Sequence, residues 1–424
     1  TLQASKILGD ATNTRAVWLG LAKSYTSRNW GCSRPDVGAL DTLSADEVRH
    51  WIWKRLVIEE IWRQPRARTR TRQLQRANYN AYVMALVPGG RWLVTGHQHG
   101  LVCYYDLDME TLTPVTLVEP IRDDPIPGAW QYVQALEVCV EIGTPTLQFL
   151  VAFSGISEHW RPIEWIHVWR VKLEPDNTLK PTRLTSVPCD RLSSTHNLSL
   201  TPDIIARTVG GGMNTCVELF WWKECSSTRV LRSVIPVEPP TGYIRILRGN
   251  RILYIKIHGG IYIYDYPEPQ YTNDLEIPDR HAPPRQAQWS HPLNKHGRVG
   301  FSRLFSNAAG YQQVMSTEFG VLGVVIPVSP DDSPCVIKLS KLRHYPTVYG
   351  LGLHRGYGAS RPGRATRFGY SWDPSGPKTA YRNTWKGNFR VPGGDHRGVD
   401  FDEETGRFVY WKMGGNVCLV DFIS

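Results

Sequence analysis

The chain has 424 residues, of which 41% are hydrophobic and 11% aromatic, enough apolar material for a packed core, so global disorder is excluded. No run approaches the roughly 18–20 continuous apolar residues of a membrane-spanning helix, so no membrane role is expected. The formal net charge of +10 leaves nucleic acid open as a class of partner.

The chain opens at Thr1 without an initiator Met or a leader segment, and we expect a fragment or a processed product. None of its eight cysteines has the close spacing of a zinc ribbon. Several stand in apolar, strand-like runs, where a reduced cysteine behaves as a small hydrophobic residue. The sequence therefore predicts a reducing intracellular compartment, cytoplasmic or nuclear.

Residues 1–62 have the pattern of a helical region. The apolar residues of 4–25 predict two short amphipathic helices, broken near Thr12–Thr14. Ser44 and Glu47 form a capping-box signature, which predicts that a second helical segment starts there and runs to Trp62. Its apolar residues at helical intervals are Val48, Trp51, Ile52, Leu56 and Ile61.

Residues 63–76, "RQPRARTRTRQLQR", carry six Arg and no acid. Such an arm can neutralise phosphates of nucleic acid. Alternating Thr and Arg after Pro65 also fit an extended, solvated linker. No helix-turn-helix, finger or RNA-binding aromatic motif accompanies the charge, so we interpret the segment as a basic linker.

From residue 77 onward, short runs of β-branched and aromatic residues bounded by Gly, Pro, Asn or Asp predict strands. Several pairs of runs read as hairpins of one form, a strand, a tight turn and a second strand with Asp or Trp near its end. These hairpins start at Arg91, Gln148, Ile204, Arg251, Gln313 and Arg407. The Asp and Trp residues, which we interpret as structural anchors, are Asp106, Trp169, Trp221, Asp265 and Asp421.

Turn glycines at Gly100, Gly212, Gly260 and Gly415 are separated by about 50 residues or multiples of it. A unit of about 45–55 residues built from short strands is the size of one four-stranded propeller blade. Residues 77–424 hold about seven such units. The predicted fold is mainly β, a β-propeller of about seven blades preceded by a short N-terminal α-helical region. A pair of β-sandwiches, the alternative, would need no repeat.

Two segments interrupt this rhythm, 266–298 and 343–398, and we expect both to be long surface loops. Within the second, "SRPGRATRFGYSW" interleaves Arg with aromatic residues. That composition is typical either of a flexible basic loop or of a site for phosphate, nucleic acid or an acidic peptide.

His97 and His99, one residue apart, suggest a metal site or the turn of a hairpin. A metal would need further ligands, and no matching pair stands nearby in sequence. Sister hairpins have Gly259 and Gly414 where this one has its histidines, which favours the turn. No nucleophile, acid–base pair or phosphate loop stands in a suitable context, so we expect a non-enzymatic protein without metal or cofactor.

The N-terminal segment "LQASKILGDATNTRAVWLGLAKSY" resembles the last part of an F-box. A helix, a basic segment and "VPGGRWLVTGHQHGLVCYYDLD" then follow in the order typical of fungal-type F-box proteins with a C-terminal WD-type propeller. The resemblance implies the substrate-recognition subunit of a Skp–cullin–F-box ubiquitin ligase. Its helical region would bind a Skp-type adaptor, and its propeller would bind a target protein or phosphopeptide.

By the same resemblance, the residues expected to bind the adaptor are Leu2, Ile7, Leu8, Val17 and Trp18. Those expected to bind an acidic or phosphorylated target are Arg355, Tyr357, Arg361, Arg364 and Arg367, chosen for their basic and aromatic character. Two alternatives stay open, a propeller scaffold without a ubiquitin role and a propeller associated with nucleic acid.

Overall fold

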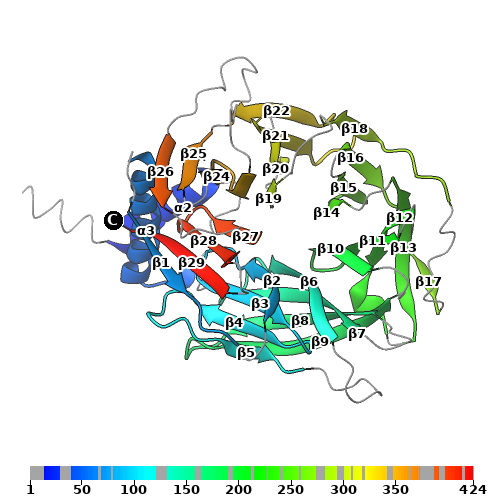
Figure 1. The fold of residues 1–424 in the computed structure, drawn as a ribbon, viewed down its shortest axis with the longest axis horizontal. Coiled ribbons are helices and arrows are strands. Elements are labelled where there is room, and N and C mark those ends of the chain that lie inside the picture. Colours follow the sequence, from blue (N-terminus) through cyan, green and yellow to red (C-terminus); the bar gives the residue numbers. More distant parts are fainter. Residues whose placement is uncertain are drawn as a thin grey trace, which may run out of the picture.

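The computed structural model shows a ring of seven antiparallel sheets, the blades, around a central axis (Figure 1). The first strand of each blade lies toward the centre, and helix α3 lies at the outer edge of the ring beside β1 and β26. The prediction of about seven blades after a helical region is confirmed. The structure describes residues 14–28, 40–64, 68–77, 80–120, 131–157, 164–189, 194–211, 214–226, 228–238, 242–256, 259–273, 282–293, 300–306, 309–317, 320–340, 347–361, 364–370, 372, 386–390, 397–412 and 416–423.

The first four blades follow the chain in order. Blade 1 contains β2 (Ala81–Leu86), β3 (Trp92–His97), β4 (Val102–Asp106) and β5 (Val115–Val118). Blade 2 contains β6 (Gln131–Val140), β7 (Gln148–Ser157), β8 (Glu164–Leu173) and β9 (Leu179–Cys189). Blade 3 contains β10 (Ser194–Leu200), β11 (Ile205–Gly211), β12 (Asn214–Phe220), β13 (Val230–Val237) and β17 (Gln270–Thr272), with the short helix η2 (Trp222–Glu224). Blade 4 contains β14 (Tyr243–Leu247), β15 (Arg251–Ile255), β16 (Gly260–Asp265) and β18 (Trp289–Pro292).

The last three blades complete the ring. Blade 5 contains β19 (Gly300–Ser306), β20 (Gly310–Thr317), β21 (Gly320–Pro327) and β22 (Cys335–Ser340). Blade 6 contains β23 (Thr347–Leu351), β24 (Arg355–Arg361), β25 (Arg364–Gly369) and β26 (Lys386–Arg390). Blade 7 contains β27 (Arg397–Asp402), β28 (Arg407–Lys412), β29 (Asn416–Ile423) and β1 (Arg68–Gln73).

Strand β1 closes the ring, because it comes before the first blade in sequence and pairs with β29 of the last. The register runs from Arg68 opposite Ile423 to Gln73 opposite Cys418. This corrects the interpretation of 63–76 as a linker. The alternating Thr and Arg gave no apolar face to recognise, since the strand is bound through its backbone and through ion pairs such as Arg72 with Asp421 at 2.8 Å.

The two segments expected to be surface loops also contain strands. Residues 343–398 supply all four strands of blade 6, and 266–298 supply β17 and β18. Blade 6 is rich in Gly and Arg and lacks the apolar alternation that signals a strand. Its strands are stabilised by ladder hydrogen bonds and by buried aromatic side chains such as Tyr357 and Phe368.

All six predicted hairpins are present and form the second and third strands of their blades. The aspartates near the ends of the third strands act as anchors in blades 1 and 7. Arg91 pairs with Asp106 at 2.7 Å, and Arg407 pairs with Asp421 at 2.9 Å. Arg251 instead donates to the carbonyl oxygens of Pro327 and Val328, which links blade 4 to blade 5.

Helix α3 (Ala45–Arg63) begins as predicted. The Ser44 hydroxyl accepts from the Glu47 N–H, and the Glu47 carboxylate accepts from the Ser44 N–H. The short helix η1 (Leu40–Thr42) precedes it, and α2 (Arg15–Arg28) packs on its first half through Ala22 and Tyr25. The part of the predicted helix pair before Thr14 lies outside the described residues.

The core of the ring is distributed over its blade junctions. Each of the seven junctions holds a cluster of buried apolar side chains contributed by both neighbouring blades. At the junction of blades 6 and 7, helix α3 also contributes, through Ile58, Ile61 and Trp62. Trp62 is fully buried, with ring centroids 4.8 Å from Phe422 and 5.8 Å from Phe401. The helix is therefore part of the propeller core.

We predict that Trp62→Ala lowers the free energy of unfolding by about 3–5 kcal/mol, because it leaves a cavity at the junction of blades 6 and 7. Trp53→Ala, on the same helix but with a side chain that is 59% exposed, should change it by less than about 0.5 kcal/mol. Urea denaturation followed by tryptophan fluorescence measures both. Equal effects of the two substitutions would contradict the docking of α3 on the ring.

Candidate functional site

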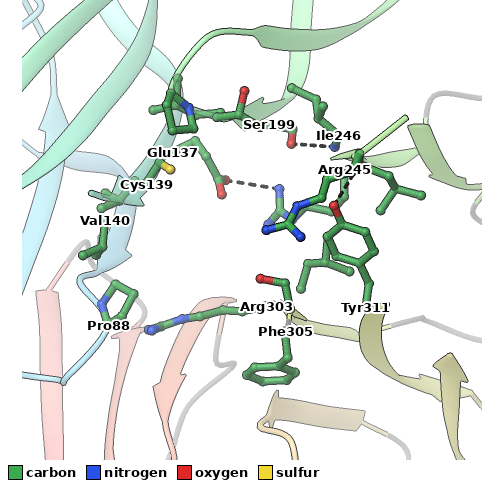
Figure 2. Close-up of a pocket in the computed structure, with 18 of the residues that line it drawn as sticks. Pro88, Glu137, Cys139, Val140, Ser199, Arg245, Ile246, Arg303, Phe305 and Tyr311 are labelled. Carbon is green, nitrogen blue, oxygen red and sulfur yellow. Dashed lines mark hydrogen bonds and ion pairs between the residues drawn. The ribbon is translucent and has the colours of Figure 1, made fainter. Parts of the chain in front are cut away.

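Two cavities lined by inner strands lie near the axis of the ring, and they are together called the central channel. The larger, about 590 Å³, lies where the inner strands end, and residues from six of those strands line it (Figure 2). The smaller, about 240 Å³, lies toward the start of inner strands β2, β6, β10 and β14. Glu137 of β6 and Arg245 of β14 line both, so this pair stands between the two cavities.

Charged side chains from different blades project into the large cavity (Figure 2). Glu137 and Arg245 are 3.4 Å apart, and Arg303 of β19 lies 3.7 Å from Asp400 and 3.8 Å from Asp402. These separations are long for charge-assisted hydrogen bonds. Burial raises the pKa of Glu137, and the neighbouring Arg245 offsets this only in part. The ion pair with Arg245 therefore does not fully offset the cost of burying the Glu137 carboxylate in the channel.

The loop after β27 connects this cavity to helix α3. Glu404 lines the cavity and forms a buried ion pair with Arg55 of α3 at 3.1 Å. The Arg55 guanidinium also lies 3.8 Å from the centre of the Trp51 ring. Glu403, in the same loop, accepts backbone hydrogen bonds from Leu353 and His354 of blade 6. The loop after β27 therefore contacts helix α3 and blade 6, and it also forms part of the wall of the large cavity.

Three of the residues expected to bind a target face this helix and not solvent. Tyr357 is buried between blades 6 and 7, and Arg355 pairs with Glu59 of α3 at 3.2 Å. Arg367 is fully buried and donates to the carbonyl oxygens of Ile61 and Gln64 at the C-terminal end of α3. This corrects the expectation, since these side chains attach the helix and are not accessible to a target.

The other two, Arg361 and Arg364, stand at the ends of β24 and β25, and their side chains lie outside the described part of the chain.

Among the residues expected to bind the adaptor, Val17 is 40% exposed. Trp18 is half-buried and packs on the cluster that joins α2 to α3, so it stabilises the helical region. Leu2, Ile7 and Leu8 lie outside the described residues.

The structure adds three exposed apolar residues of the helices, Leu21, Trp53 and Leu56, that the sequence did not single out for binding. Leu56 belongs to the apolar residues at helical intervals, yet its side chain is 37% exposed. Trp53 could have been found from its position outside the apolar stripe of the helix that contains Val48 and Trp51. A large aromatic side chain on the polar side of a helix indicates a binding site for another protein.

The interpretation of the His97 and His99 region as a turn is confirmed. His97 is buried in β3, with Nε2 2.8 Å from the Thr95 hydroxyl, and His99 has a positive φ of 61° in the turn before Gly100. In the described part of the chain, no group of three or more His, Cys, Asp or Glu side chains is placed to hold a metal ion.

Three arginines of the basic segment pair within the chain. Arg70 pairs with Glu110, Arg72 with Asp421, and Arg76 donates to the Asn416 side chain. These guanidinium groups are bound to the protein's own side chains, which weakens the case for a nucleic-acid-binding arm.

A search against protein-family models found no match, and a search of curated proteins found none either. Among solved structures, the chain is similar to the β-propeller domain of Cps50 (Swd1) from Myceliophteria thermophila, with a TM-score of 0.53. The two are 11% identical, over 84% of this chain and 100% of that one. At this identity the likeness shows the fold alone. The protein has the fold of a seven-bladed β-propeller. No helix in its described part could span a bilayer.

Asp108, after β4, connects three parts of this assembly through ion pairs to Arg407 of blade 7 at 2.5 Å and Lys54 of α3 at 3.2 Å. Burial alone would raise the pKa of Asp108, but Arg407 and Lys54 together lower it to about 2. Because the folded state lowers this pKa, the stabilisation is complete above the ordinary value of 3.8 and is lost as the pH falls through about 2.

We predict that Asp108→Asn destabilises the protein at neutral pH, and that the difference from wild type shrinks as the pH falls from about 4 toward about 2. The midpoints of urea unfolding for both proteins, measured between about pH 4 and pH 2, give this difference. Asp203→Asn removes an exposed pair with Lys223 and should change the midpoint little at any pH. A difference for Asp108→Asn that does not vary with pH would contradict the electrostatic role.

Proposed function

We propose that this chain is a non-enzymatic substrate-recognition subunit of a Skp–cullin–F-box ubiquitin ligase, in which the helical region binds a Skp-type adaptor and the propeller binds a target protein. The observation that carries the proposal is that the helical region has both a side attached to the ring and exposed apolar side chains. One side of α3 is buried in the ring, while apolar side chains elsewhere on the two helices remain in solvent.

The exposed apolar side chains occur on both helices. In α2, Val17 and Leu21 are 40% and 46% exposed and stand one turn apart, so they share a face. In α3, Trp53 and Leu56 are 59% and 37% exposed and stand three residues apart. The two helices pack together, and exposed apolar residues on neighbouring elements are typical of protein-interaction sites. A Trp that becomes buried on binding commonly contributes much of the binding energy of such a site.

The attachment of α3 supports a presenting role. Arg55, Trp62 and Glu59 are all held by blades 6 and 7, and α3 is followed within a few residues by the closing strand β1. A partner bound to the helices would therefore keep a fixed orientation relative to the channel. Such fixed geometry suits a subunit that positions one protein for modification by another.

We predict that purified chain captures a purified Skp-type adaptor, and that the double substitution of Leu21→Asp with Trp53→Ala weakens capture at least tenfold, about 1.4 kcal/mol. Ile142→Ser is the control, because Ile142 is a 75% exposed apolar residue on blade 2, away from the helices. Biolayer interferometry with immobilised adaptor gives the affinities.

Equal capture by both variants would contradict the assignment of the surface. No capture by the wild-type chain would remove the ligase role and leave the alternative, a propeller scaffold without a ubiquitin function.

A further inference from the structure

The small cavity has rigid aromatic walls. Tyr82 is 44% exposed, its hydroxyl accepts a hydrogen bond from Gln98 at 2.8 Å, and its ring lies 5.7 Å from that of Tyr132. Tyr243 stacks on Phe301 with centroids 4.6 Å apart. Because both lining rings are held by neighbours, they form a fixed surface and need no rearrangement to receive a ligand.

One of these rings already holds a cation. The Arg245 guanidinium lies 4.3 Å from the centre of the Tyr243 ring, within the range of a cation–π interaction. Trp411, from β28, adds a third aromatic ring to the lining. Aromatic walls of this kind attract positive charge through the negative faces of their π systems.

The cavity also contains hydrogen-bond acceptors with too few donors. The side-chain oxygen of Gln134 is buried and has no donor in the described part of the chain. Glu137 has Arg245 as its one ion-pair partner there, at 3.4 Å, although a carboxylate can accept about four hydrogen bonds. Buried acceptors without donors are costly, so a ligand that brings N–H groups would gain by satisfying them.

A bulge in β6 explains how both acceptors reach one cavity. Residues 134 and 137 differ by three positions, which would place their side chains on opposite faces of a regular strand. The pairing of β6 with β7 shifts register between Val133 and Ala135, so that Gln134 has no partner in the ladder. The bulge places Gln134 and Glu137 in the lining of the same cavity.

The lining offers one donor as well. The indole N–H of Trp411 is buried and has no acceptor among the described residues. A peptide that inserts a cationic side chain also brings backbone carbonyl groups, which are suitable acceptors for this N–H. The volume of about 240 Å³ is below the range of about 300–1,000 Å³ typical of small-molecule pockets, and it favours one inserted side chain.

We propose that the small cavity binds a lysine or arginine side chain from an exposed segment of a protein partner, with Tyr82 and Trp411 beside the cation and Glu137 and Gln134 accepting its N–H groups. This inference rests on the proposed function in taking the propeller as the part that binds a target. It assigns to that target a basic motif, in place of the acidic motif expected from residues 355–367.

The test uses capped tripeptides, Ala-Arg-Ala and Ala-Lys-Ala, titrated into the purified chain by isothermal titration calorimetry, with Ala-Gln-Ala and Ala-Glu-Ala as comparisons. We expect the basic peptides to bind at least tenfold more tightly than the Gln peptide. Glu137→Gln should weaken the basic peptides at least tenfold and Tyr82→Leu about threefold. Glu141→Gln should leave binding unchanged, because Glu141 follows β6 directly, pairs with Arg170 and lines neither cavity.

Basic peptides that bind no better than the Gln peptide, or that bind Glu137→Gln and Tyr82→Leu as tightly as wild type, would overturn the proposal. Preferred binding of the Glu peptide would overturn it as well and point to the arginines of the large cavity. If Glu137→Gln fails to fold, the affinity of the Tyr82→Leu variant for the basic peptides tests the proposal, because the Tyr82 side chain is partly exposed. The titration needs no adaptor, so the two proposals can fail separately. Peptide binding without adaptor capture would contradict the ligase role alone. Adaptor capture without peptide binding would contradict the basic-side-chain site alone.

Discussion

Pairing between β1 and β29 is the interaction on which the rest of the structure depends. It joins a strand that precedes the first blade to the last blade, so that residues from both ends of the described chain complete the four strands of blade 7. Both channel cavities exist only while the ring is closed, because their walls come from blades far apart in sequence. Arg72 of β1 reinforces the pairing through Asp421 of β29, and Arg70 links β1 to blade 1 through Glu110.

Helix α3 extends this closure to the N-terminal region. Trp62 fills the junction of blades 6 and 7, and the buried pair of Arg55 with Glu404 joins the helix to the wall of the large cavity. A buried ion pair adds little net stability but is costly to break, since either partner alone would leave an uncompensated charge. The helix is thus held in one orientation, and the surface proposed for the adaptor has a defined position relative to the channel.

The sequence predicted the elements whose local pattern matches their structure. The capping box at Ser44 and the hairpins that start at Arg91 and Arg407 are of this kind, and the repeat of these hairpins gave the fold. The role of β1 and the existence of blade 6 could not be predicted, because polar strands owe their pairing to partners more than 300 residues away or to Gly-rich neighbours. Arg367 was expected to meet a target, because nothing local shows that it lies against α3. Single charged residues within apolar strands, such as Glu137, are the signal that would have indicated the channel.

Hydrogen–deuterium exchange of the intact chain tests most directly whether the helical region and the ring form one closed unit. We predict that the amides of β1 that donate to β29 exchange about as slowly as those of β28 and β29, and that Trp62→Ala accelerates exchange in all three strands together. Rapid exchange of these β1 amides in the wild-type chain, with β28 and β29 protected, would contradict it and return this segment to the role of a linker.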